Sequence, residues 1–471
     1  MPRAAVGVAV SVAVALAARL VLGRSSHNYD AAWGLLWGRD LLHHGTLPGE
    51  GGATPRPLAT LVSGMATLLG ERAAQELLLL SGFLALGALV WVTYRLGEVT
   101  LTRWAGVFGA VLVALSPVFV PLAIVAFQDV PFAALVLGAA VLEARRPRRG
   151  LAVLALLAVA GLVRPQAWIL AGAYWLWLFP ALDRRGRMVT LAAALAAPVA
   201  WMLADLAVSG SPLYSFTGTR AGAQLAGRQT GLGNVPGRAL DNLRGMFPTP
   251  VVLAGVLGPA VALAVPSVRR RARVVLALAV LGGLWFILLG LAELPLNGRY
   301  MLVAGAVGAL LAGWLATGWI DWRPGRGRRA AWAVAGTLLT VATLAAIPAN
   351  VGLLLDTRAR LDERAAAVAD LQSLARRPIA RAVATRCHTV VVPNPRPLPY
   401  LAYALDHPPG AFVYEGADPR GRGLFLVPTS QQADLRLLRN DDPTSPLTVA
   451  RPPGARLVAA NGSWALLANR C

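Results

Sequence analysis

Apolar stretches about as long as a lipid bilayer is thick recur along this chain and constrain its fold more than any other feature. Only 14% of the 471 residues are charged and 56% are hydrophobic, too little charge to cover the surface of a soluble protein. A transmembrane helix needs about 20 predominantly apolar residues, so we predict an α-helical polytopic membrane protein with about eleven transmembrane helices. The stretches lie at residues 4–23, 74–96, 103–120, 129–144, 150–163, 166–180, 188–207, 247–267, 274–291, 300–319 and 331–349.

Every basic residue is an arginine, and the 44 arginines are unevenly distributed. A net charge of +21 would suggest a nucleic-acid partner for a soluble protein. Here, arginine blocks occupy every second loop, as the positive-inside rule predicts for cytoplasmic loops. We therefore expect no nucleic acid, a lipid bilayer as the surroundings, and a cytoplasmic N-terminus that begins with an uncleaved helix. The blocks are at residues 145–149, 184–187, 269–273 and 323–329.

The composition also indicates the source. Arginine without lysine, together with abundant Ala, Gly, Pro and Val, indicates a high-GC bacterium. The predicted location is the bacterial plasma membrane, crossed several times.

The chain is predicted to form two domains, with the boundary near residue 350. Residues 1–350 are expected to form the transmembrane module, and residues 351–471 a small extracytoplasmic α/β domain. The tail should begin with an amphipathic helix over 353–377, followed by short β-like runs separated by Pro- and Gly-rich turns. These runs are at residues 389–392, 411–414, 424–427 and 464–467.

The first outer loop, residues 24–73, is long enough to hold structure of its own. Apolar residues recur at helical spacing over 31–44 and 57–69, which predicts two amphipathic helices lying at the membrane interface. Trp33 and Trp37 are expected to anchor the first of them, since Trp is enriched at that level of the bilayer.

Cys387 and Cys471 are the two cysteines of the chain. Both belong to the segment expected outside the cytoplasm, where disulfides persist. We predict a disulfide between them, which on the chain-entropy account stabilises the fold by up to about 4–5 kcal/mol. The alternative is two free thiols.

Two acids follow apolar stretches in outer loops, and the predicted topology places both on the same face of the membrane. Asp30 lies beyond the first stretch, beside Tyr29, and Asp129 lies beyond the third. Each alone can be a helix-terminal residue. Acids near membrane level are costly and tend to mark sites, and a carboxylate can take the proton from an attacking hydroxyl. The second acid could orient the acceptor, or the pair could hold a divalent cation.

Arginines on the same face are candidates for binding phosphate. Arg164 interrupts an apolar stretch, and Arg299 precedes Tyr300 at the start of a late one. A guanidinium binds phosphate oxygens in pairs and keeps its charge; snorkelling to the interface is the alternative. The segment 208–246 carries further arginines against the positive-inside trend, and its glycines favour a mobile gating loop. These arginines are Arg220, Arg228, Arg238 and Arg244.

Other motifs contribute little. The side chains of the adjacent His43 and His44 diverge by about 100° on a helix, so we interpret them as a structural pair. The sequence contains no phosphate-binding glycine loop, dinucleotide fingerprint or nucleophile elbow. No cofactor is expected, and a divalent cation stays an open alternative.

The order of the outer motifs, Asp30, Asp129-Val130-Pro131, Arg164-Pro165 and Arg299-Tyr300, resembles that of the GT-C superfamily of integral-membrane glycosyltransferases. The resemblance covers about residues 1–350. The most similar branch contains protein O-mannosyltransferases, the lipid A aminoarabinose transferase and actinobacterial arabinofuranosyltransferases. It implies that Asp30 is the catalytic base and that a polyprenyl-monophosphate sugar is attacked on the outer face with inversion. Many relatives have two adjacent acids in the first loop, whereas Asp30 follows Tyr29 here, so the resemblance does not extend to a metal site.

The leading hypothesis is therefore a hexosyl- or pentosyltransferase that acts on an envelope glycan, lipid or protein. Asp30 and Asp129 are its catalytic candidates, and the donor phosphate is assigned to Arg164, Arg299, Tyr300, Arg220 and Arg228. One alternative is a transporter or flippase for a lipid-linked precursor, which would carry ionisable residues deep in several spans. Another is a non-catalytic envelope scaffold, in which the two acids would be dispensable.

Overall fold

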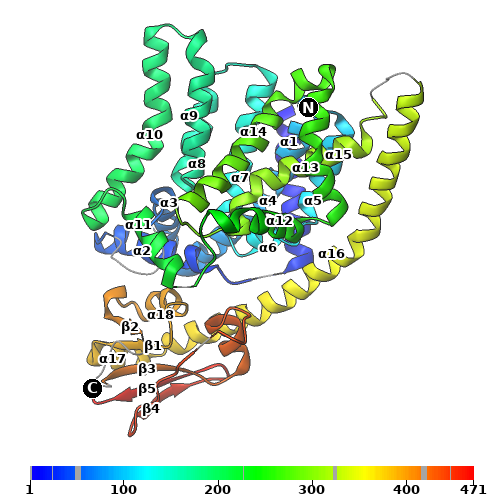
Figure 1. The fold of residues 1–471 in the computed structure, drawn as a ribbon. Helices are drawn as coiled ribbons and strands as arrows, with labels where there is room; N and C mark the ends of the chain where they lie inside the picture. Colours follow the sequence, from blue (N-terminus) through cyan, green and yellow to red (C-terminus); the bar gives the residue numbers. More distant parts are fainter. Residues whose placement is uncertain are drawn as a thin grey trace. The chain divides into compact units, whose positions relative to one another are not determined.

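The computed structural model describes residues 3–23, 25–47, 55–225, 227–321, 326–414, 422–445 and 447–471. Positions 24 and 48–54 of the predicted first loop and positions 323–325 of the last arginine block lie outside the described residues. The chain divides into two compact units (Figure 1). Unit 1 comprises Met1–Gly23, Arg56–Ala59 and Leu80–Leu355, and unit 2 comprises Arg24–Pro55, Thr60–Leu79 and Asp356–Cys471.

Two long helices contribute residues to both units: α4 (Glu71–Thr100) and α16 (Arg326–Ala375). The helix predicted over 353–377 is thus the end of α16, a continuous helix of 50 residues. The other helices of unit 1 are α1 (Arg3–Leu22), α5 (Arg103–Ala114), α6 (Phe119–Ile124), α7 (Asp129–Arg145), α8 (Leu151–Val163), α9 (Gln166–Leu178), α10 (Arg184–Ser209), α11 (Tyr214–Leu225), α12 (Val235–Met246), α13 (Thr249–Ala264), α14 (Pro266–Leu291) and α15 (Leu302–Thr317), with short 3₁₀ turns η1 (Phe179–Ala181), η2 (Leu232–Asn234) and η3 (Gly298–Met301).

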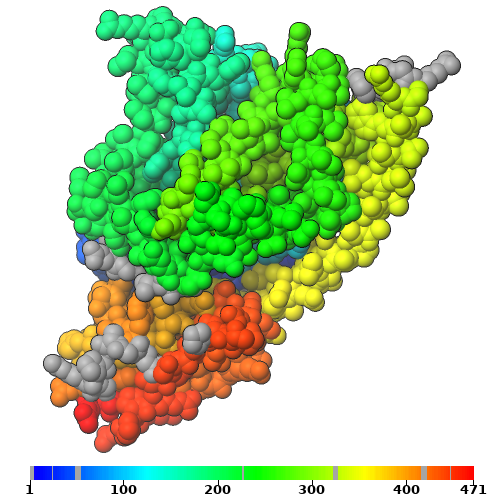
Figure 2. All heavy atoms as spheres, viewed as in Figure 1, coloured from blue at the N-terminus to red at the C-terminus, as the bar shows by residue number. Residues whose placement is uncertain are grey.

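Unit 1 is a multi-pass membrane bundle. Within the described residues, 6 helices are long and apolar enough to cross a membrane, by length and composition. Apolar side chains stay exposed along them; on α10, for example, Met188 is 63% and Leu203 60% exposed, and the side chains of this helix lie on the surface in Figure 2. Such a surface requires a hydrocarbon environment. The six are the segments Ala5–Leu22, Glu71–Thr100, Arg184–Ser209, Pro266–Leu291, Gly298–Thr317 and Gly327–Ala375.

Each predicted apolar stretch coincides with a helix, with one break. The stretch at 103–120 divides into α5 and α6 because Pro117 follows Ser116, whose hydroxyl donates to the carbonyl oxygen of Met246 at 3.0 Å. The centre of unit 1 is α15, which packs against α5 and α13 with most of its side chains buried. Glycines permit this close approach, since a Cβ on Gly109 would lie 2.7 Å from Cδ2 of Leu310.

The segment predicted as a mobile gating loop, 208–246, consists mainly of two helices, α11 and α12. That prediction was wrong about local structure. Pro236 stands in the first turn of α12, where its missing N–H costs nothing. The glycines are therefore tolerated inside or between short helices.

Unit 2 is built around a five-stranded mixed sheet in the order β2-β1-β3-β5-β4. The strand β1 pairs in parallel with β2 and β3, whereas β5 pairs antiparallel with β3 and β4. Four strands coincide with the predicted β-like runs, and β4 was missed. The strands are β1 (Val390–Val392), β2 (Phe412–Tyr414), β3 (Gly423–Pro428), β4 (Arg456–Ala460) and β5 (Trp464–Asn469); the helices are α2 (Tyr29–His44), α3 (Pro57–Thr67), α17 (Pro378–Cys387) and α18 (Leu398–Leu405), with η4 (Pro409–Ala411) and the π-helix η5 (Ala433–Leu438).

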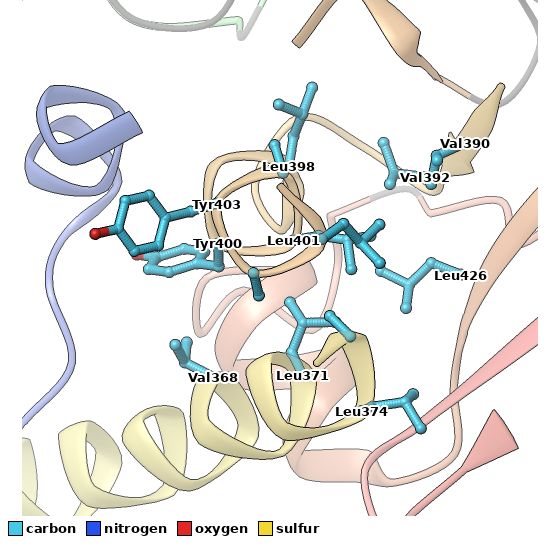
Figure 3. Packing of buried hydrophobic residues seen from close by; sticks show 14 of the residues in the cluster. Val368, Leu371, Leu374, Val390, Val392, Leu398, Tyr400, Leu401, Tyr403 and Leu426 are labelled. Carbon is cyan, nitrogen blue, oxygen red and sulfur yellow. The ribbon is translucent and has the colours of Figure 1, made fainter. Parts of the chain in front are cut away.

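The core of unit 2 joins the end of α16 to α18 and the sheet. Figure 3 shows Leu371 of α16 beside Leu401 of α18, with Leu426 of β3 close by. Cys387 at the end of α17 forms a disulfide with Cys471, with Cα atoms 4.8 Å apart, which ties the end of the chain to this core.

The helix α2 belongs to the same core, so the prediction that Trp33 and Trp37 anchor it in the bilayer was wrong. Trp33 is 1% and Trp37 2% exposed, and both lie in the hydrophobic cluster that contains α18. Two Trp residues one turn apart mark an apolar helix face whether it meets lipid or protein. Gly38 of α2 and Gly64 of α3 are in backbone contact, so a Cβ on Gly38 would lie 2.4 Å from the backbone N of Gly64.

Candidate functional site

The predicted site residues of unit 1 gather at one end of the α7–α8 hairpin. The helix α7 begins at Asp129, α8 ends directly before Arg164, and the two helices pack against each other. The arginine block at 145–149 lies at their other ends. The candidate site and this block are therefore at opposite ends of the hairpin.

Asp129 and Arg164 form a buried ion pair. Nη2 of Arg164 donates a hydrogen bond to Oδ2 of Asp129. Arg164 is 5% exposed and Asp129 is 0% exposed. Oδ1 of Asp129 and Nε of Arg164 are buried and have no hydrogen-bond partner. Buried polar atoms without partners are uncommon and costly in native proteins, which marks this ion pair as a candidate site.

Aromatic rings and a second arginine surround this pair. The guanidinium carbon of Arg164 lies 5.0 Å from the ring centre of Tyr300. That of Arg299 lies 5.2 Å from the ring of Phe127 and 5.4 Å from the ring of Tyr300. Tyr300 therefore holds two guanidinium groups near one another through cation–π contacts.

Arg56 is a third cation of this group, and the sequence reasoning missed it. Its Nη1 donates to Oε1 of Gln128 at 3.1 Å, next to Asp129. Both Arg56 and Arg299 act electrostatically on Arg164. Three guanidiniums around one carboxylate make a net positive site, suited to phosphate. A lone arginine between Pro55 and Pro57 was the signal that could have identified it.

Arg220 and Arg228 are placed differently. Arg220 forms an exposed ion pair with Glu293. Arg228 lies beyond the end of α11 and is exposed. The backbone N–H of Leu296 donates to the carbonyl oxygen of Gln229, the residue after Arg228, at 3.1 Å. The loop of Arg228 thus contacts the loop that leads to Arg299.

Asp30 belongs to unit 2, where it occupies the first turn of α2 and is half-buried. The N-cap of this helix is Asn28, whose side-chain oxygen accepts from N–H of Ala31 at 3.1 Å. The capping interpretation of Asp30 was therefore wrong.

Two tyrosines lie within the electrostatic reach of Asp30. Burial raises the pKa of Tyr29 and of Tyr400 above the ordinary value, and the charge of Asp30 adds to both shifts. Both phenols therefore stay protonated at neutral pH. The Tyr400 hydroxyl donates to the carbonyl oxygen of His27 at 2.7 Å, which holds the segment before α2 against α18.

The described part of the chain contains no group of three or more His, Cys, Asp or Glu residues that could hold a metal ion. Within unit 1, the guanidinium on Oδ2 of Asp129 opposes a cation at that oxygen. Nε2 of His43 lies 3.2 Å from the hydroxyl oxygen of Thr67, and Nε2 of His44 lies 3.9 Å from Oδ1 of Asp406.

No family model and no curated protein matches the sequence. The crystal structure of ArnT from Cupriavidus metallidurans in the apo state is similar over 99% of this chain and 98% of its own, with TM-score 0.54 and 15% identity. The same protein bound to undecaprenyl phosphate is similar over 98% of this chain and 97% of its own, with TM-score 0.54 and 15% identity.

A second kind of structure is also similar. The Archaeoglobus fulgidus oligosaccharyltransferase tethered with an acceptor peptide matches 85% of this chain and 63% of its own, with TM-score 0.51 and 14% identity. At these identities the likeness concerns the fold. This chain therefore has the fold of these two structures, and that is the fold which the resemblance to the GT-C superfamily implied.

Proposed function

We propose that this protein is a membrane glycosyltransferase that moves a sugar from a polyprenyl-monophosphate donor to an envelope glycan, lipid or protein. The observation that carries the proposal is the cluster of Arg56, Arg164 and Arg299 around the buried Asp129. This cluster lies in a fold shared with ArnT, one structure of which is bound to undecaprenyl phosphate.

The arginine cluster is suited to a phosphate that gains charge as it leaves. Arg299 and Arg164 are held by cation–π contacts with Tyr300, so their guanidiniums are positioned before the donor binds. Fixed cations stabilise a developing phosphate charge without reorganising during the reaction. In this proposal Arg228 adds positive charge from the neighbouring loop. Arg220 contributes less, because its guanidinium pairs with Glu293.

The reaction follows from these charges. An acceptor hydroxyl attacks the anomeric carbon, the bond from that carbon to the phosphate oxygen breaks, and the configuration inverts. Asp30 takes the hydroxyl proton as general base, and the polyprenyl phosphate leaves with the electron pair, stabilised by the guanidiniums. Oδ1 of Asp129, buried and without a partner, accepts a hydrogen bond from a hydroxyl of the donor sugar.

The proposal also assigns the site to the outer face of the membrane and gives the reaction no metal requirement. Because the positive-inside rule assigns the arginine blocks to the cytoplasm, the end of unit 1 that carries Asp129 is placed on the outer side of a bacterial plasma membrane. Unit 2 is placed on the outer side too, where it contributes to acceptor binding. No metal is required, because Arg164 already neutralises Asp129.

The test uses membranes that contain the full chain, supplied with polyprenyl phosphates bearing labelled mannose, arabinofuranose or aminoarabinose. We expect one of these donors to transfer label in the presence of excess chelator. Arg299→Ala should lower kcat/KM about 10–100-fold, the effect of one charge-assisted hydrogen bond, whereas Arg456→Ala, an exposed arginine of β4, should not. Transfer by none of the donors, or an unaffected Arg299→Ala variant, would contradict the proposal.

A further inference from the structure

We propose that unit 1 also binds an anionic phospholipid, at a site separate from the candidate transferase site. The site is a pocket of about 270 Å³ between α7, α8, α9 and α14. It is lined by Ala140 and Glu143 near the end of α7, whereas Asp129 begins that helix. The two sites are thus at opposite ends of α7.

The pocket itself matches an acyl chain. Its walls are mostly aliphatic, with Val136, Leu157 and Leu278 among the lining residues. An apolar cavity does not hold water, and these helices are surrounded by lipid. Hydrocarbon is therefore the material that fills it.

The mouth of the pocket matches an anionic headgroup. Trp177 is 43% exposed, and the guanidinium carbons of Arg148 and Arg273 lie 5.2 Å and 5.7 Å from its ring centres. Trp is enriched at the level of the lipid headgroups. Two guanidiniums beside such a ring form a small cationic surface next to the apolar pocket.

Glu143 is the carboxylate of the pocket, and its oxygens are already bound. It accepts hydrogen bonds from the Tyr174 hydroxyl at 2.8 Å, from Nε1 of Trp177 at 3.2 Å and from the backbone N–H of Arg148 at 2.9 Å. These bonds fix the loop that carries Arg148. One carboxylate against two guanidiniums leaves a net positive mouth.

The surroundings increase this charge. The ends of α7, α10 and α14 nearest the pocket carry the arginine blocks at 145–149, 184–187 and 269–273. Basic pockets between transmembrane helices bind anionic lipid headgroups. The charge complementarity therefore favours phosphatidylglycerol over zwitterionic phosphatidylcholine.

The test is native mass spectrometry of the delipidated full chain, offered equal amounts of phosphatidylglycerol and phosphatidylcholine with identical acyl chains. We expect retention of phosphatidylglycerol, lowered about fivefold in Arg273→Ala, since one arginine near the lipid surface contributes about that factor. Arg270→Ala removes the same charge from the same block without lining the pocket, and should have a smaller effect.

A second pair of variants tests the apolar part. Ala277→Trp obstructs the pocket and should lower retention, whereas Val280→Trp, on an exposed position of α14, should not. Size-exclusion profiles identify any variant that fails to fold, and Arg273→Lys, which keeps the charge, should restore retention. Equal retention of both lipids, equal effects of Arg273→Ala and Arg270→Ala, or displacement of phosphatidylglycerol by undecaprenyl phosphate would overturn the proposal.

Discussion

Arg164 donates from Nη2 to Oδ2 of Asp129, and both side chains are buried in unit 1. Replacing a buried ion pair by apolar residues can be neutral, but removing one partner leaves an uncompensated buried charge. The pair therefore has two roles in this account. It fixes the ends of α7 and α8, and in the proposed reaction it holds the guanidinium of Arg164 near the donor phosphate.

The first prediction concerns the stability that depends on this pair. Arg164→Ala should destabilise the protein by about 3–5 kcal/mol, because the buried Asp129 loses the guanidinium that donates directly to its Oδ2. Arg220→Ala breaks an exposed pair, with side chains 44% and 51% exposed, and should cost less than about 1 kcal/mol. Thermal unfolding in detergent measures both.

The double variant of Asp129 and Arg164 to alanine provides the control for this first prediction. Its destabilisation should be smaller than the sum of the two single variants, because neither charge is then left alone. Additive effects would show that the two residues do not act as a pair.

Apolar length and arginine placement made the fold of unit 1 predictable. A span must be apolar along its whole length, so the predicted stretches coincide with helices, except that the stretch at 103–120 divides into α5 and α6. The break at Pro117 was also visible in the sequence, although the prediction ran through it. Local patterns do not show which distant segments pack together. The placement of α2 in the core of unit 2 was therefore not predicted.

The second prediction follows from that placement. Trp33→Ala should destabilise unit 2 by about 3–5 kcal/mol, as expected for a large aromatic side chain removed from a core. Trp104→Ala removes a side chain that is 46% exposed and should have a small effect. Intrinsic fluorescence during unfolding compares the two variants, and equal effects would restore the interfacial interpretation of Trp33.

The candidate site was only partly predictable. Asp129, Arg164 and Arg299 stood out because charges interrupt or border apolar stretches. Arg56 did not, because it lies outside the predicted helices and reaches the site through Gln128. Tyr400 could not be linked to the segment before Asp30 from sequence, since its bond to His27 joins residues 373 positions apart.

The third prediction concerns pH. Burial lowers the pKa of His27 below its ordinary value of 6.5, and its Nε2 donates to the carbonyl oxygen of Gln75 at 2.8 Å. The unfolded chain therefore binds the proton more readily than the folded one. The contribution of neutral His27 to the free energy of unfolding should be fully present above pH 6.5. It should be lost as the pH decreases from there toward the lowered pKa.

Thermal unfolding between pH 7.5 and 5 checks this third prediction. His27→Gln keeps a hydrogen-bond donor but does not titrate, so its melting temperature should fall less steeply over the same range. The same slope in both proteins would mean that His27 is not the titrating group.

The central claim is that Asp30 accepts the proton of the attacking hydroxyl, and the turnover of the Asp30→Asn variant tests it most directly. This substitution keeps the shape of the side chain and removes the base, so we predict that kcat for sugar transfer falls by about 10²–10⁴-fold. Binding of undecaprenyl phosphate should be unchanged, and Asp362→Asn, an acid on the exposed part of α16, should transfer sugar normally. Sugar transfer by Asp30→Asn within a few-fold of the unsubstituted protein would contradict the assignment of Asp30 as the general base.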